Sequence, residues 1–128
     1  MRDKLQPDEA VAILAVALAD ADRPLGPLRR RRLGRRIARL AGAPQPHLDE
    51  ALQLVLTHVR RDGTQATMER VKEALPEPAD RHHAVRVALR LAGQGRRLKE
   101  RQLGHAFRLA DLLGLSQWEF SGLVAQVV

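Results

Sequence analysis

Apolar residues recur at helical spacing along most of this chain. In the clearest stretch, Leu48, Leu52, Val55, Leu56 and Val59 share one face of a helix. No stretch alternates between apolar and polar residues for long enough to indicate a β-strand. The pattern therefore predicts an all-α domain, a compact bundle of about seven helices.

Prolines, glycines and capping residues mark the expected ends of these helices. The last helix has the clearest start, because Ser116 and Glu119 form a capping box and Leu115 and Phe120 occupy the positions of a hydrophobic staple. The expected helices run over about 7–20, from Pro27 to Gly42, from Leu48 to the turn at Asp62-Gly63, through Met68 to Leu75, over about 79–92 and 99–113, and from Ser116 to the C-terminal end.

The chain carries an internal repeat. A helix of small apolar residues, a short loop and a basic helix occur at 7–42 and again about seventy residues later at 79–115. Leu25 in the loop of the first copy corresponds to Leu98 in the second. We expect a single domain, 1–128, built from two helix-loop-helix halves, with 116–127 as a closing helix.

Composition excludes several classes of protein. The apolar content of 45% comes almost entirely from Ala, Leu and Val, and the aromatic residues are Phe107, Trp118 and Phe120, which is typical of helical bundles. The chain has no cysteine, which excludes disulfide scaffolds, thiolate zinc sites and cysteine nucleophiles. No apolar stretch is long enough to cross a bilayer, so we expect no transmembrane segment and a cytoplasmic location.

The net charge of the chain is +7, from 22 basic and 15 acidic residues. A charge of this sign attracts nucleic acid, anionic lipid headgroups and acidic proteins. Arginine greatly outnumbers lysine in a chain rich in Ala, Leu, Gly and Pro, and a GC-rich genome produces the same bias. Composition alone leaves both explanations of the basic excess open.

The residues that usually carry catalysis form no recognisable set. Ser116 is explained as a helix cap, and neither it nor Ser121 lies in a nucleophile motif. The histidines show no metal-binding spacing on a helix face; they are His47, His58, His82, His83 and His105. Because a phosphate-binding glycine loop is also absent, the sequence favours a protein that is not an enzyme and uses no cofactor.

The helix expected from Pro27 is strongly amphipathic. Leu33, Ile37 and Leu40 share one narrow sector, arginines occupy the opposite side, and the segment 23–39 contains no acidic residue. Arginine binds phosphate and carboxylate groups with paired hydrogen bonds, so this side is a candidate binding surface; the alternative is that the arginines only solvate their helix. With the corresponding stretch of the second half, the candidate residues are Arg31, Arg32, Arg35, Arg36, Arg39, Arg96, Arg97, Lys99 and Arg101.

The chain resembles the tellurite-resistance protein B (TerB-like) family. The resemblance is carried by the second half, from Arg101 through Arg108 to Phe120, in which a helix ending in Leu113-Gly114-Leu115 precedes a short closing helix. It covers about residues 7–127. The resemblance implies an all-helical fold with two related halves, and a setting in bacterial stress response or a membrane-proximal assembly.

Members of the TerB-like family have acidic residues at the two loop-helix junctions, and these are associated with divalent cations. Of the four carboxylates that the resemblance would supply, this chain keeps Asp22, with Asp20 as a neighbour. The other positions are occupied by Arg29, by Gly95 or Gln94, and by Gln102. Calcium binds six or more oxygen atoms, and an arginine repels the ion. We therefore expect no metal site, with Asp20 and Asp22 as the residual candidates.

The sequence thus favours a non-enzymatic interaction module whose partner is another protein with an acidic surface. The alternative is a sequence-nonspecific nucleic-acid-binding protein that uses the arginine-rich faces. No zinc finger, RNA-recognition motif or series of stacking aromatic residues accompanies those faces. An anionic membrane surface as partner and a homo-oligomer also remain open.

Overall fold

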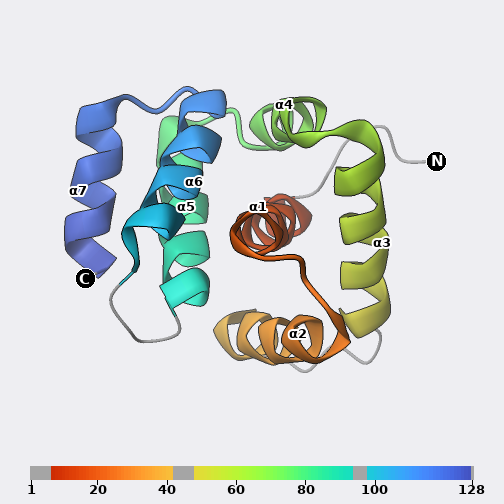
Figure 1. Ribbon diagram of the computed structural model, residues 1–128. Coiled ribbons are helices and arrows are strands. Elements are labelled where there is room, and N and C mark those ends of the chain that lie inside the picture. The colour runs from red at the N-terminus through yellow and green to blue at the C-terminus, as the bar shows by residue number, and fades with distance from the viewer. Residues whose placement is uncertain (1–6, 42–47, 94–97, 128) are drawn as a thin grey trace.

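The described part of the chain consists of α-helices and short connections. The computed structural model describes residues 7–41, 48–93 and 98–127, and no β-strand occurs within these ranges. The all-α prediction is confirmed (Figure 1), and the helices begin and end within about two residues of the predicted positions. They are α1 (Pro7–Asp22), α2 (Pro27–Ala41), α3 (Leu48–Asp62), α4 (Thr64–Ala74), α5 (Pro78–Gly93), α6 (Glu100–Leu112) and α7 (Gln117–Val127).

Helix α1 lies at the centre of the molecule, with other helices around it (Figure 1). The consecutive residues 13–18 are all apolar, and each is at most 7% exposed. A helix that is apolar on every side is stable only when neighbours cover every side, and α3, α4, α5 and α6 pack against α1. The apolar stretch near the start of the sequence is therefore the core helix of the domain.

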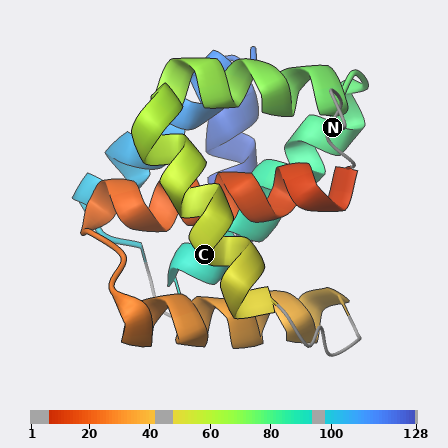
Figure 2. The ribbon, with the colours of Figure 1, turned by 90° about the vertical axis from the view of Figure 1, so that its right-hand side faces the viewer.

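Helix α2 lies at the edge of the molecule, at the bottom of the views in Figures 1 and 2. It packs against α3 and α5, with Leu33 buried and Ile37 packed on the core. The other side of α2 points away from the rest of the described chain (Figures 1 and 2). The amphipathic pattern of α2 therefore leaves its charged side accessible to a partner.

Local sequence signals set the start of α7 as predicted. Gly114 has a φ of 87°, a left-handed conformation that glycine adopts without strain. The N–H of Glu119 donates to the hydroxyl oxygen of Ser116, and the N–H of Ser116 donates to the carboxylate of Glu119, both at 3.1 Å. Leu115 and Phe120 are both buried. The capping box is confirmed, and the burial of Leu115 and Phe120 agrees with the predicted hydrophobic staple.

The two halves bury corresponding leucines. Leu25 precedes α2 and is 4% exposed, and Leu98 precedes α6 and is 6% exposed. In the preceding helices, Leu18 and Leu91 are also buried. Helices α1 and α5, which begin the two halves, share the most extensive helix-helix contact of the described chain. Superposition of the complete halves stays a prediction.

Candidate interaction surface

The outward side of α2 carries the arginines that the sequence selected. Leu33 is 4% exposed and fixes the inward side of the helix to the core. On the opposite side, four arginines are exposed, whereas Arg36 lies on the flank, about 60° from Leu33 around the helix, and is half-buried. We call this surface the arginine face; it consists of Arg31, Arg32, Arg35, Arg36 and Arg39.

No carboxylate of the described residues forms an ion pair with the arginine face. The first turn of α2 also contains no acidic residue. The pKa of Arg36 is lowered from its ordinary value, first because its side chain is partly buried and then because Arg32 and Arg39 repel its charge. Arginine nevertheless stays charged at physiological pH, so the arginine face concentrates positive charge.

A leucine borders the arginine face at the N-terminal end of α2. Leu28 is 62% exposed, and the turn of about 100° per residue places it about 180° from Ile37 around the helix. The same geometry places Leu28 within about 40° of Arg32, Arg35 and Arg39. Leu28 is absent from the residues selected from the sequence, although the helical pattern alone gives its angular position.

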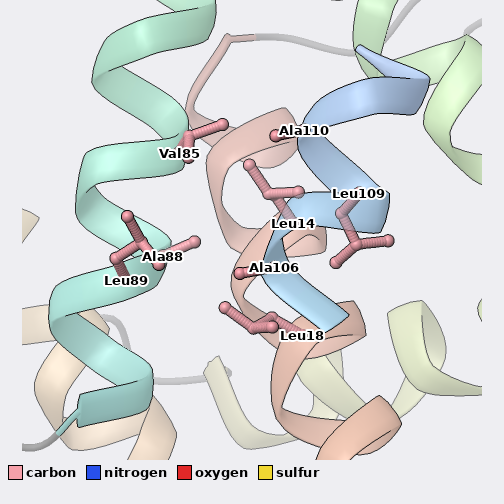
Figure 3. Close-up of a pocket in the computed structure, with 8 residues that line it drawn as sticks. All are labelled: Leu14, Leu18, Val85, Ala88, Leu89, Ala106, Leu109 and Ala110. Carbon is pink, nitrogen blue, oxygen red and sulfur yellow. The ribbon is translucent and has the colours of Figure 1, made fainter. Parts of the chain in front are cut away.

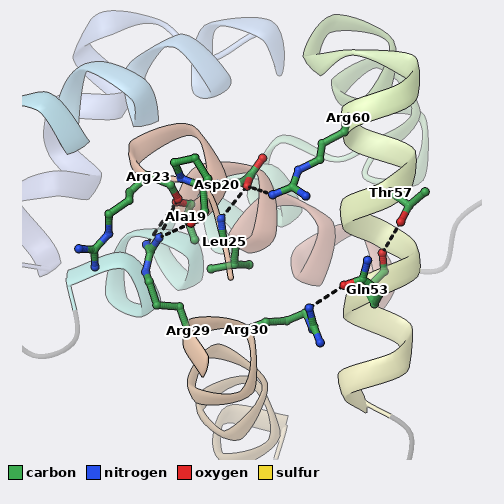
Figure 4. Close-up of polar contacts among 10 residues, drawn as sticks. Ala19, Asp20, Arg23, Leu25, Arg29, Arg30, Gln53, Thr57 and Arg60 are labelled. Atoms are coloured by element: carbon green, nitrogen blue, oxygen red, sulfur yellow. Dashed lines mark hydrogen bonds and ion pairs between the residues drawn. The ribbon is translucent and has the colours of Figure 1, made fainter. Parts of the chain in front are cut away.

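Arg29 contacts the loop that follows α1. Its guanidinium group donates to the backbone carbonyl oxygens of Arg23 at 2.7 Å and Pro24 at 3.1 Å, and to that of Ala19 at 3.5 Å (Figure 4). The oxygens of Arg23 and Pro24 belong to the loop, and that of Ala19 lies in the last turn of α1, which carries partial negative charge. Arg29 therefore holds the loop between α1 and α2 in place.

Asp20 fixes the same junction. Its carboxylate accepts a hydrogen bond from the backbone N–H of Leu25 and another from the guanidinium group of Arg60, both at 2.9 Å (Figure 4). The side chain of Asp22 lies outside the described residues. Among the side chains that are described, no three potential metal ligands form a cluster. The structure thus gives Asp20, one of the two residual metal candidates, a role in holding the junction.

Arg30 joins α2 to α3. Its guanidinium group donates to the side-chain oxygen of Gln53 at 2.6 Å (Figure 4). Arg30 lies seven residues before Ile37 and therefore shares its inward side of the helix. The run of arginines at the start of α2 thus divides into two pairs: Arg29 and Arg30 make internal contacts, whereas Arg31 and Arg32 point outward.

The basic residues selected in the second half are described only in part. Lys99 and Arg101 are exposed at the start of α6. Arg96 and Arg97 lie outside the described residues. A single basic surface formed by both halves therefore stays a prediction, and the arginine face of α2 is the part of it that the structure describes.

A small cavity lies between α1, α5 and α6. Its volume is about 10 Å³, and its lining consists of leucine, valine and alanine side chains (Figure 3). A cavity of this size has room for about one water molecule, and ligand pockets are far larger and include a few oriented polar groups. This cavity is a packing gap in the core.

Two histidines make surface contacts. His82 of α5 is paired with Glu119 of α7 at 2.5 Å, and this hydrogen bond, with those from Ser116, lowers the pKa of Glu119. The imidazole Nδ1 of His58 lies 2.7 Å from the guanidinium group of Arg61. The pair of His82 and Glu119 helps hold α7 against α5.

The function of the chain has to be inferred from its own surface chemistry. Within the described ranges, no helix is both long and apolar enough to span a bilayer. Comparison with protein-family models, with curated proteins and with solved structures finds no match to this chain.

Proposed function

We propose that this protein is a non-enzymatic interaction module that binds an acidic surface of another protein through the arginine face of α2. The observation that carries the proposal is that no carboxylate of the described chain pairs with these outward-pointing arginines. Burial and mutual repulsion lower the pKa of Arg36. Carboxylates of a partner would relieve the repulsion and accept paired hydrogen bonds from the guanidinium groups.

The resemblance to the TerB-like family adds a setting to this proposal: a cytoplasmic protein of bacterial stress response, related to tellurite resistance. In that family the junction carboxylates are associated with divalent cations. Here Arg29 donates to carbonyl oxygens at the junction, and Asp20 is paired with Arg60. We therefore propose that the chain binds a macromolecule and not a metal ion.

Nucleic acid is the second candidate partner. Arg31, Arg35 and Arg39 follow one another along α2 at steps of about 6 Å, and each could neutralise a phosphate group. The arginine face has no amide side chain that could read base edges and no aromatic residue on which bases could stack. Binding of this kind would depend on charge and not on base sequence.

Two double variants of equal net charge test the proposal. Arg31→Gln/Arg35→Gln removes two arginines from the arginine face, whereas Arg70→Gln/Arg108→Gln removes two exposed arginines from α4 and α6. Fluorescence anisotropy measures binding of a glutamate-rich peptide at about 150 mM salt, where attraction between distant charges is largely screened. We expect the first variant to bind about tenfold more weakly than the second, because each lost ion pair costs roughly 0.7 kcal/mol.

Equal losses in the two variants would mean that binding follows net charge alone, and would overturn the proposal. Tighter binding of a DNA duplex than of the peptide at the same salt would favour the nucleic-acid alternative. In that case, the slope of log K against log salt should become shallower by about one unit for each lost phosphate contact.

A further inference from the structure

Leu28 adds an exposed apolar side chain at the N-terminal end of the arginine face. Its side chain is 62% exposed, and it lies on the same stripe of α2 as Arg32, Arg35 and Arg39. The N-terminal end of α2 adds partial positive charge beside it, and the first turn contains no acidic residue that would offset this charge. A partner that covers this surface therefore meets an apolar side chain between the positive helix terminus and the arginines.

We propose that Leu28 is the apolar anchor of this surface, and that the partner is an acidic protein segment that carries an apolar side chain. This inference rests on the proposed function and specifies the chemistry of the partner. A few side chains supply most of the affinity at protein interfaces, and the polar contacts beside them exclude water. Leu28 is the exposed apolar side chain next to the arginines and can take this role.

The two other polyanionic partners leave Leu28 unused. A nucleic-acid backbone offers phosphates and sugars to the arginines and has no apolar side chain to pack on Leu28. An anionic membrane takes up an amphipathic helix through its apolar side, but Leu33 and Ile37 on that side of α2 are packed on the protein core. A protein segment supplies both carboxylates and an apolar group.

The dimensions of α2 specify the partner further. From Leu28 to Arg39 the surface extends about 16 Å along the helix, or about three turns. A partner helix of similar length with carboxylates one turn apart would present them at the same spacing as the arginines. Its apolar side chain would lie at the end that contacts Leu28, where the positive helix terminus also attracts a neighbouring carboxylate.

The inference is tested with two glutamate-rich peptides of about twelve residues, one with a leucine and the other with glutamine in its place. Wild type, Leu28→Gln and Arg31→Gln/Arg35→Gln are compared. Trp118→Gln serves as the matched control, because Trp118 is an apolar side chain that is 89% exposed on α7. A DNA duplex and vesicles of phosphatidylserine and phosphatidylcholine serve as the alternative ligands, and melting temperatures verify that the variants are folded.

We expect Leu28→Gln to bind the leucine peptide about tenfold more weakly than wild type, because a partly buried leucine contact is lost. The same variant should bind the glutamine peptide and the duplex as wild type does. Trp118→Gln should bind both peptides within about twofold of wild type. Arg31→Gln/Arg35→Gln should lose affinity for both peptides.

Each other outcome identifies the step that is wrong. If Arg31→Gln/Arg35→Gln weakens binding and Leu28→Gln does not, Leu28 is no anchor, but the proposed function stands. If Leu28→Gln weakens binding to the duplex or the vesicles as much as to the leucine peptide, the choice of an acidic protein segment is overturned. If neither peptide binds to wild type, both the proposed function and this inference fall.

Discussion

Replacement of Asp20 tests how the junction between α1 and α2 positions the arginine face. The carboxylate of Asp20 accepts hydrogen bonds from the backbone N–H of Leu25 and from Arg60, both at 2.9 Å. Asp20→Asn keeps an oxygen atom for the N–H of Leu25 but loses the negative charge opposite Arg60. Asp20→Ala removes both interactions. The two variants therefore separate the contribution of the hydrogen bond from that of the ion pair.

Burial sets the expected sizes of the two contributions. The side chain of Arg60 is 50% exposed and that of Asp20 is 18% exposed, so we expect the ion pair to contribute about 0.2–1 kcal/mol to the free energy of unfolding. Leu25 is 4% exposed, and a buried N–H without an acceptor costs about 1–3 kcal/mol. Asp20→Asn should therefore lower the free energy of unfolding by less than about 1 kcal/mol, and Asp20→Ala by about 2–3 kcal/mol.

Urea unfolding followed by circular dichroism measures both differences. Added salt should reduce the effect of Asp20→Asn, because salt screens an exposed ion pair, and should leave the difference between the two variants unchanged. If both variants lose the same free energy, the N–H of Leu25 is not the main partner of Asp20. If Asp20→Ala costs less than about 0.5 kcal/mol, this carboxylate does not hold the junction.

Calcium or magnesium at millimolar concentration should shift the melting temperature by no more than about one degree. The reason is that Asp20 is paired with an arginine and that Arg29 donates to carbonyl oxygens at the junction. A melting temperature that rises with metal concentration and then saturates would argue against this. The hydrogen bond from His82 is the main cause of the lowered pKa of Glu119. The stabilisation linked to that shift is present above the ordinary pKa of a glutamate and is lost as the pH falls through the lowered value in the folded protein. Urea unfolding at several pH values should show that the free energy of unfolding falls less at acidic pH in Glu119→Gln than in wild type. A pH profile identical to that of wild type would contradict this. Trp118 is 89% exposed, so its emission and its quenching by iodide should match those of a free tryptophan amide; shielding would instead indicate self-association that covers α7.

The helices were predictable from the sequence because local chemistry sets their ends. Ser116 and Glu119 satisfy each other's backbone N–H groups across one helical turn, and the left-handed turn at Gly114 needs only a glycine. The outward side of α2 was predictable for the same reason, since the arginines and Leu33 follow a helical period. Leu28 could have been selected from the same pattern, because its angular position depends on the helix alone.

The contacts that position α2 depend on tertiary structure. Asp20 and Arg60 are 40 residues apart in the chain, and no periodicity relates their positions. Arg29 and Arg31 belong to the same run of arginines, and the path of the loop before α2 brings its carbonyl oxygens to Arg29. A residue that resembles part of a binding surface in the sequence can thus make structural contacts in the fold.

The most direct test of the arginine face is an NMR titration of isotopically labelled protein with the leucine-containing acidic peptide. Saturable changes in amide chemical shift should be concentrated in residues 28–39 of α2, and they should be lost in Arg31→Gln/Arg35→Gln and retained in Arg70→Gln/Arg108→Gln. Changes centred on α7, or spread over basic residues of all helices and equal in the two variants, would contradict the assignment of the arginine face as the binding surface.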